Sequence, residues 1–315
     1  MPERLHFTRY GPLDVPGGED LISRFIRRFG EWAYLESSFV RRQVPTGAAI
    51  LDAGAFVGTF SLAMASRAPA RLVAVEANPE LLPLLRSNFE RLGPPTYCVH
   101  HGVLSDRSGV QTVRTKSCPT NLGAQEFLPP NFDAVDDPQV RHELTLPAIS
   151  LSDLRAEHGP FDLIKLDIEG AELAALQGDA EHLGKTLPTL WMECNEDPRV
   201  LALYAFIVLL GYEVHFFMYP SFNPDNFLNN EEPIFSLAYE AGLLATKVNE
   251  KPKSLSPLMQ KAGCELISVR DIDHLRECLW LTPRWGKADW ANYTRNQLLG
   301  FVSRLVRQHD FKNFL

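Results

Sequence analysis

The stretch ILDAGAFVGTFSL, residues 50–62, is the first place in the sequence where residue types and spacing indicate chemistry. Its apolar start predicts a buried strand, and Asp52, Gly54 and Gly58 follow before a helix begins. Gly54 lets the backbone turn sharply and approach a ligand, and Gly58 lets the next helix pack closely. Such a turn can hold a small ligand, although Asp52 could instead cap the helix.

The residues inside the turn favour a ligand without phosphate. A dinucleotide fingerprint has the pattern GxGxxG, and Phe56 occupies the place of its middle glycine, where a phenyl ring would crowd a pyrophosphate. The charge of Asp52 repels phosphate but can bind an ammonium group. S-adenosylmethionine carries an ammonium group and no phosphate. The sequence therefore predicts that this cofactor is bound by Asp52, Gly54, Ala55, Phe56 and Gly58.

Polar residues also follow the next two predicted strands. Glu76 ends the second strand about 20 residues beyond the glycines, where a carboxylate accepts hydrogen bonds from ribose hydroxyls. Ala77 and Asn78 follow and are expected at the same site, although Asn78 could be a plain helix cap. Ser105 and Asp106 end the third strand and are expected to meet the adenine ring, with a surface turn as the alternative.

The fourth and fifth predicted strands supply the candidate catalytic residues. Lys165 and Asp167 are two residues apart and should point to the same side, and Glu193 and Asn195 reach the same edge of the sheet. A carboxylate at this edge can accept a proton from a reacting group. Asp167 is the first candidate, Glu193 is the second, and Lys165 is the expected partner of Asp167. Asp167, Glu193 and Asn195 could also ligate a divalent metal, but no ligand set is resolved and no metal is predicted.

A second ligand, an acceptor with hydroxyl edges and apolar faces, would be recognised by amides and aromatic rings in loops. The predicted acceptor-binding residues are Asn121, Asn195, Tyr219, Asn223 and Asn226. For Phe216, Phe217 and Trp191, which lie on predicted strands, core packing is the preferred interpretation.

Alternating strand and helix patterns from Ala48 onward must position these residues. Such alternation implies crossover connections and a parallel sheet, and ligands bind at the carboxyl edge of such sheets. Residues 106–150 interrupt it with a predicted hairpin and a long loop. The sequence thus predicts an α/β fold with an N-terminal helical cap (1–45), a main domain (46–245) and a C-terminal extension (246–315).

Composition and charge disfavour several classes of protein. The formal net charge of −8 provides no broad basic surface, so nucleic acid is not an expected partner. The apolar run from Leu201 is shorter than the ~20 residues of a membrane-spanning helix and predicts a buried helix, a stop at Gly211 and a core strand. The start of the chain lacks an apolar signal segment, and the five cysteines show no zinc-ligand spacing, which favours a cytoplasmic location. His100, His101 and His215 are expected to be hydrogen-bonded strand residues.

Taken together, the motifs resemble the FkbM-type S-adenosylmethionine-dependent methyltransferases. The resemblance is carried by LDAGAFVGTFSL, VAVEANPELLPLLRSNFE, LSDL at 151–154, FDLIKLDIEGAELAALQG and TLWMECNE. It implies a class I methyltransferase (Rossmann-like) fold, with a mostly parallel seven-stranded sheet and helices on both faces. It also implies S-adenosylmethionine as methyl donor and O-methylation of a sugar or secondary-metabolite hydroxyl. The usual turn of the family has Asn where this chain has Phe56.

Two alternatives of other classes stay open. One is an NAD-dependent oxidoreductase, against which Asp52 and Phe56 argue. The other is a non-catalytic descendant of the fold that binds glycans. The expected partner is a small-molecule or glycan acceptor, and the oligomeric state is left open.

Overall fold

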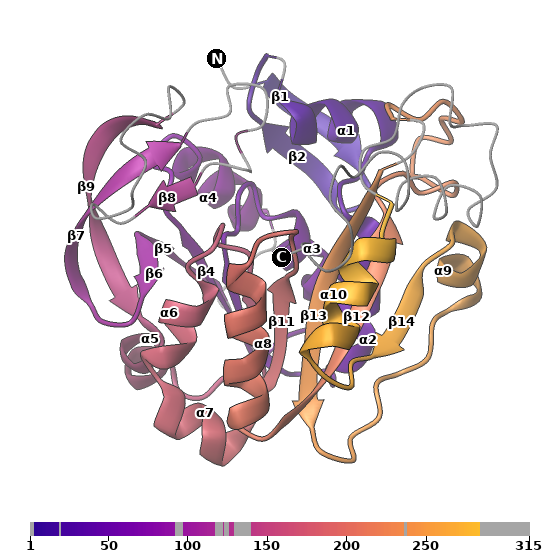
Figure 1. The fold of residues 1–315 in the computed structure, drawn as a ribbon. Helices are drawn as coiled ribbons and strands as arrows, with labels where there is room; N and C mark the ends of the chain where they lie inside the picture. Colours follow the sequence, from indigo (N-terminus) through magenta and orange to yellow (C-terminus); the bar gives the residue numbers. More distant parts are fainter. Residues whose placement is uncertain are drawn as a thin grey trace.

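An eight-stranded sheet forms the centre of the protein in a computed structural model that describes residues 3–18, 20–91, 97–116, 122, 126–128, 140–235 and 238–283 (Figure 1). Its strand order is β14-β12-β13-β11-β10-β3-β4-β5. The strands are β3 (Ala49–Ala53), β4 (Arg71–Glu76), β5 (Tyr97–His101), β10 (Leu163–Leu166), β11 (Thr189–Glu193), β12 (Tyr212–Pro220), β13 (Tyr239–Lys247) and β14 (Glu265–Ser268).

The five strands from β5 to β11 run parallel, and β13, β12 and β14 pair antiparallel beyond them. The predicted α/β sheet is therefore confirmed, but the expected number of seven strands is wrong. The additional strand is β14, a four-residue edge strand inside the predicted C-terminal extension, and it is too short to give a clear alternating pattern. The expected boundary after residue 245 falls inside β13, so the sheet continues across it.

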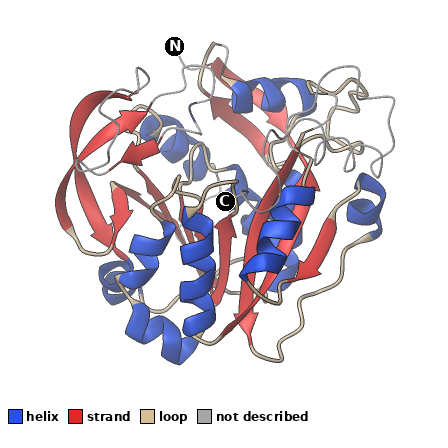
Figure 2. Cartoon of the chain, in the orientation of Figure 1, coloured by secondary structure: helices blue, strands red, loops and turns tan. Residues whose placement is uncertain are grey.

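Helices cover both faces of the sheet (Figure 2). One apolar core contains residues of α5 (Leu151–His158), α6 (Glu172–Gln177), α7 (Ala180–Thr186), α8 (Arg199–Leu209) and α10 (Ile272–Leu281). The other contains residues of α1 (Leu21–Phe29), α2 (Tyr34–Gln43), α3 (Thr59–Ala65), α4 (Leu82–Glu90) and α9 (Pro257–Ala262). Along β3, Leu51 belongs to the first core and Ile50 to the second, so strand alternation places Asp52 on the α2 and α3 side.

The N-terminal segment is not entirely helical. It begins with an antiparallel hairpin of β1 (Glu3–Thr8) and β2 (Gly11–Val15), which the sequence analysis did not predict. The helices expected in this segment are present, and Ile22, Phe25, Ile26 and Phe29 are buried in α1. Asp20 caps the start of α1, and Gly30 ends the helix at φ 69°.

The predicted hairpin within residues 106–150 is confirmed. β7 (Gly109–Lys116) pairs antiparallel with β9 (Val140–Ser150), and β8 (Glu126–Leu128) and β6 (Val103–Ser105) complete a four-stranded sheet. β6 was predicted as a continuation of β5. The two strands separate at Gly102, where a Cβ atom would lie 2.5 Å from the carbonyl oxygen of Pro147.

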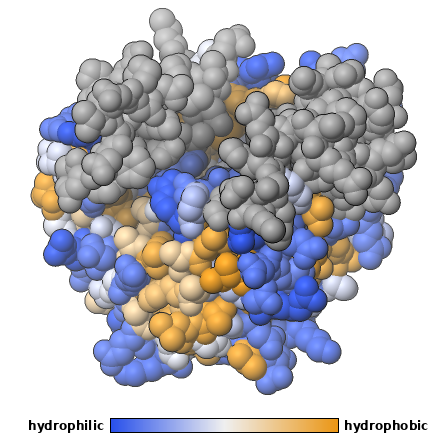
Figure 3. Space-filling model, in the orientation of Figure 1, coloured by the Kyte–Doolittle hydropathy of each residue, from blue (hydrophilic) through white to orange (hydrophobic). Residues whose placement is uncertain are grey.

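The apolar run from Leu201 forms α8 and β12, with Gly211 at φ 97° between them, as predicted. The helix is buried on one face only, because Val208 and Leu209 are 43% and 82% exposed. Figure 3 shows apolar side chains gathered over α6 and α8. Among the described residues, no helix is both long and apolar enough to span a membrane.

Candidate active site

A cavity open to solvent lies at the carboxyl edge of the parallel strands. The empty space inside it, including the part open to solvent, is about 1020 Å³. The α1 and α2 region covers it with Ile22, Trp32, Glu36 and Ser37. The structure brings these predicted site residues together on its wall: Gly54, Ala55, Phe56, Glu76, Ala77, Asn78, Lys165 and Asp167.

The glycine turn uses its backbone amides inside the protein. The amides of Gly54 and Ala55 donate to the carbonyl oxygen of Val75 at 3.0 and 3.2 Å. The amide of Phe56 donates to Glu76 Oε2 at 2.8 Å. Phosphate-binding turns point such amides at the ligand. Here the three amides already donate hydrogen bonds to acceptors within the protein.

The two glycines of the turn permit close packing within the protein. A Cβ atom on Gly54 would lie 1.7 Å from the carbonyl oxygen of Asp167, and one on Gly58 would lie 2.6 Å from the ring of Phe89. Gly58 is not on the cavity wall, so its role is the predicted packing of the next helix. Phe56 has a φ of 51°, a conformation that Asn adopts more readily than Phe, which gives a physical reason for Asn in the usual family turn.

Lys165 is the centre of a buried charge network. The parallel register of β3 and β10 sets Lys165 opposite Asp52. Lys165 Nζ lies 3.1 Å from Asp52 Oδ1 and 3.2 Å from Asp167 Oδ2, and it donates to the carbonyl oxygen of Gly54 at 2.9 Å. Burial opposes the charge, but Asp167, Asp52 and Glu36 outweigh it and raise the pKa of Lys165 above its ordinary value. The predicted pairing of Lys165 with Asp167 is confirmed.

Asp52 lies beneath the cavity rather than on its wall. Its side chain is fully buried, with Oδ1 facing Lys165 and Oδ2 accepting a hydrogen bond from Ser61 Oγ at 2.6 Å. Asp52 is absent from the cavity lining, and its expected binding of an ammonium group, directly or through water, stays a prediction. The carboxylate holds Lys165 under the glycine turn.

Glu36 is a cavity residue that the sequence analysis missed. It lies on α2, and its Oε1 accepts a hydrogen bond from Trp191 Nε1 at 2.6 Å. Burial, together with the charge of Asp167, raises the pKa of Glu36 to about 7. The sequence offered one signal for this role, since Glu36 shares a helix face with the apolar residues Phe39 and Val40 and is buried with them.

Glu76 clamps the glycine turn to the end of β4. Its Oε2 accepts from the amide of Phe56 and its Oε1 from the amide of Asn78, both at 2.8 Å. Burial raises the pKa of Glu76 to about 7, although these two hydrogen bonds act in the opposite direction. Asn78 Oδ1 accepts a hydrogen bond from the amide of Glu80 at 3.0 Å, which closes the turn before α4. The N-cap of α4 is Leu81, so the helix-capping alternative for Asn78 is wrong.

Glu193 and Asn195 do not line the main cavity. They line a second cavity beside the 169–170 turn, together with Glu169 and Arg199, and Glu169 borders both cavities. Oxygen atoms of Asp167, Glu169 and Glu193 lie within 4.8 Å of one another. Burial and the neighbouring charge of Glu169 raise the pKa of Glu193 well above its ordinary value.

Several other predicted residues lie away from the main cavity. Ser105 and Asp106 do not line it, and the wall is formed by Gly102, Val103 and Leu104, because the chain leaves the sheet at Gly102. Tyr219 is buried on β12 in contact with Phe217, with ring centroids 5.4 Å apart. Asn121 lies outside the described residues.

Asn223 and Asn226 are internal to their loop. Asn223 Nδ2 donates to Glu31 Oε1 at 2.7 Å, and Asn226 Nδ2 donates to the carbonyl oxygens of Asn223 and Asn230. Both side chains are at most 4% exposed. Their expected contact with an acceptor is therefore wrong for this arrangement, since Asn223 holds the loop to the N-terminal segment and Asn226 bonds within the loop.

Comparison with known proteins identifies one family. The family model described as "Methyltransferase FkbM domain" matches residues 52–230, a range that includes the glycine turn, Glu76, Lys165 and Asp167. A curated relative, the AMB antimetabolite synthetase AmbE of Pseudomonas aeruginosa, is 31% identical over 166 residues, which are 43% of this chain and 8% of the relative. This chain thus spans a small part of that relative's length.

Two solved structures are similar to this chain at low sequence identity. The methyltransferase FkbM of Methylobacillus flagellatus KT is 17% identical over 64% of this chain and 44% of that chain, with a TM-score of 0.40. The precorrin-6y C5,15-methyltransferase of Geobacter metallireducens GS-15 is 13% identical over 74% of this chain and 94% of that chain, with a TM-score of 0.43.

Proposed function

Because the chain belongs to the methyltransferase FkbM domain family, we propose that it transfers a methyl group from S-adenosylmethionine to a hydroxyl of a small-molecule or glycan acceptor in the main cavity. The name of the curated relative describes an antimetabolite synthetase, which supports a secondary metabolite as the second acceptor class beside a sugar.

The charge of the cavity wall is the observation that carries the proposal. Glu36, Glu76, Asp167 and Glu169 line the cavity, and Lys165 is the cation among the lining residues that the structure describes. The amides of Gly54, Ala55 and Phe56 donate to acceptors within the protein and are not available to a ligand. A pyrophosphate would therefore be repelled by the carboxylates and would gain no hydrogen bonds from these amides. A ligand with an ammonium, a sulfonium and no phosphate suits this wall better than a dinucleotide does.

The residues present fit S-adenosylmethionine, which supplies the methyl group as an electrophile. Each oxygen of Glu76 accepts one backbone amide and retains a second lone pair, with which the carboxylate would hold the ribose hydroxyls. Val103 and Leu104 would pack on the adenine in place of the predicted Ser105 and Asp106.

Asp167 is the proposed proton acceptor for the acceptor hydroxyl. Its side chain is 38% exposed, and Lys165 holds its Oδ2 in a fixed position. Lys165 stays protonated because its pKa is raised, so it orients Asp167 and does not act as a base. Glu36 is the second carboxylate available to accept the proton, and Glu193 lies on the other cavity.

The proposal is tested by transfer of a tritiated methyl group from S-adenosylmethionine to a cell-envelope glycan extract and to a secondary-metabolite extract. Asp167→Asn should lower the initial rate by about 10²- to 10⁴-fold, the usual contribution of a general base. The matched control is Asp106→Asn, an exposed carboxylate away from the cavity that should keep the wild-type rate.

Each outcome of the transfer assay is informative. No incorporation from either extract would contradict the proposed acceptor classes. Full activity of Asp167→Asn, with loss of activity in Glu36→Gln, would move the role of base to Glu36. Its pKa of about 7 predicts that the rate would then fall as the pH drops below 7.

A further inference from the structure

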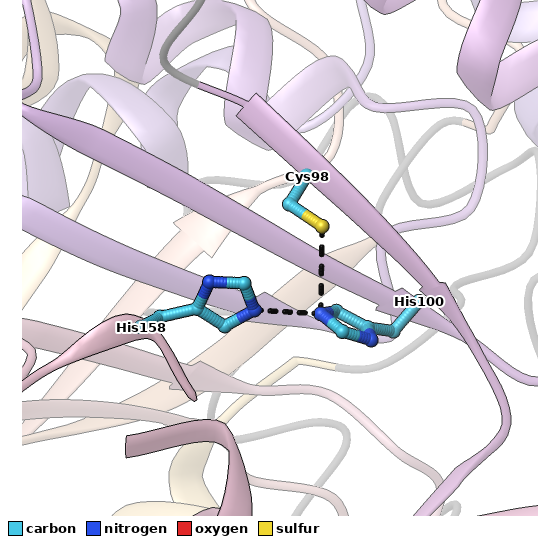
Figure 4. Close-up of side chains that lie close together, drawn as sticks. All are labelled: Cys98, His100 and His158. Carbon is cyan, nitrogen blue, oxygen red and sulfur yellow. Dashed lines mark hydrogen bonds between the residues drawn. The ribbon is translucent and has the colours of Figure 1, made fainter. Parts of the chain in front are cut away.

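A cysteine and two histidines meet on the outer part of the sheet, away from both cavities described above. Cys98 and His100 lie two residues apart on β5 and therefore point to the same side. His158 is the last residue of α5 and comes from 58 residues further along the chain. Figure 4 shows the three side chains directed toward one another from these two elements.

The distances within this cluster suit metal ligands. His100 Nε2 lies 3.5 Å from Cys98 Sγ and 2.7 Å from His158 Nε2 (Figure 4), and the three atoms lie within 4.8 Å of one another. Tetrahedral zinc, with Zn–S near 2.3 Å and Zn–N near 2.05 Å, places S and N about 3.6 Å apart and two N atoms about 3.3 Å apart. The distance from Cys98 Sγ to His100 Nε2 already matches, and the two ring nitrogens need to separate by about 0.6 Å.

A carboxylate stands beside the cluster. Glu157 Oε1 lies 3.4 Å from His158 Nε2, and the Glu157 side chain is 60% exposed, so it can turn toward a shared ion. The three central residues are half-buried, which leaves a path for an ion. None of the four residues lines the main cavity or the second cavity.

We propose that Cys98, His100 and His158 bind a Zn²⁺ ion, with Glu157 or a water molecule as the fourth ligand. One thiolate and two imidazoles are borderline and soft ligands that favour zinc over magnesium or calcium. The ion joins the edge strand β5 to the end of α5, so its role is structural. Binding forms a Zn–S bond and two Zn–N bonds and releases the thiol proton of Cys98 to solvent, while His100 and His158 coordinate through unprotonated Nε2 atoms.

The spacing of the cysteines along the chain indicated no zinc site. The pair Cys98 and His100 has a strand spacing of two, and the third ligand is distant in sequence. The proposal is independent of the methyltransferase reaction, because its residues lie outside the main cavity.

The experiment titrates the metal-free chain with Zn²⁺ by calorimetry and with Co²⁺ by absorption spectroscopy. The wild-type chain should bind one ion, release one proton and raise its melting temperature on binding Zn²⁺. With Co²⁺ it should show a thiolate-to-metal charge-transfer band and the intense visible bands of tetrahedral cobalt. These wild-type results test the site without any variant.

Cys98→Ser should remove the charge-transfer band and weaken Zn²⁺ binding by more than about 100-fold, and His158→Gln should weaken binding similarly. The matched control is His101→Gln, the next residue on β5, whose side chain points to the other side and lies near the carbonyl oxygen of Ala77. It should bind Zn²⁺ as the wild type does.

Three results would overturn the proposal. The first is a wild-type chain that binds no Zn²⁺ at micromolar concentration. The second is a Co²⁺ complex without a thiolate band, whose ion would then belong to the carboxylates of Asp167, Glu169 and Glu193. The third is binding of Cu⁺ without binding of Zn²⁺ or Co²⁺.

Discussion

Replacing Lys165 by methionine tests the charge network beneath the cavity. The side chain of Lys165 is 4% exposed and that of Asp52 is fully buried, and their charged atoms are 3.1 Å apart. Removing one partner of a buried ion pair costs about 3–5 kcal/mol, because the other charge stays buried without compensation. We expect about 3 kcal/mol for Lys165→Met, since Asp52 keeps the hydrogen bond from Ser61.

The measurement is urea unfolding followed by circular dichroism, with Asp52→Asn and the double variant in the same series. The double variant should recover at least half of the stability that Lys165→Met loses, because Asp52 is then no longer a buried charge without its partner. The reasoning is refuted if Lys165→Met loses less than about 1 kcal/mol, or if the losses of the two single variants simply add.

The remaining predictions concern pH, the turn and the loop. Burial raises the pKa values of Glu36 and Glu76 from 4.5 to about 7. Each group therefore stabilises the folded state below pH 4.5, and this stabilisation, about 3 kcal/mol per group, is lost as the pH rises through 7. Thermal unfolding of Glu36→Gln between pH 5 and 8 should therefore change less than that of wild type, and equal slopes would contradict this. Gly54→Ala should prevent folding, as judged by circular dichroism, because the added Cβ would meet a backbone carbonyl. The control Gly47→Ala, where φ is 80° and the space around the residue is open, should lower the free energy of unfolding by only about 1 kcal/mol. Asn223→Ala should lower the free energy of unfolding in urea by about 1–3 kcal/mol, because it removes a hydrogen-bond donor from buried Glu31. A changed affinity for S-adenosylhomocysteine in this variant would contradict the placement of Asn223 away from the cavity.

The parts of the fold set by local patterns were predictable. The apolar strand and glycines of residues 50–62 gave β3, the turn and α3, and the i, i+2 spacing of Lys165 and Asp167 placed both at the carboxyl edge. The short edge strand β14 and the first hairpin carry weak local signals and were missed.

Contacts between distant segments were not predictable from one sequence. The register of β3 against β10 pairs Asp52 with Lys165, a contact that the sequence analysis did not predict. Asn223 had the composition of a binding loop, yet it holds Glu31, 192 residues away. Cys98 and His158 illustrate the same limit, since only the packing of α5 near β5 brings them together.

Calorimetric binding of S-adenosylhomocysteine to the wild-type chain and to Glu76→Gln tests the central claim most directly. We predict one binding site in the wild-type chain, no binding of NAD, and at least about tenfold weaker binding in Glu76→Gln, which loses the charged acceptor at the ribose position. Absence of binding to S-adenosylhomocysteine, or binding of NAD in its place, would contradict the account.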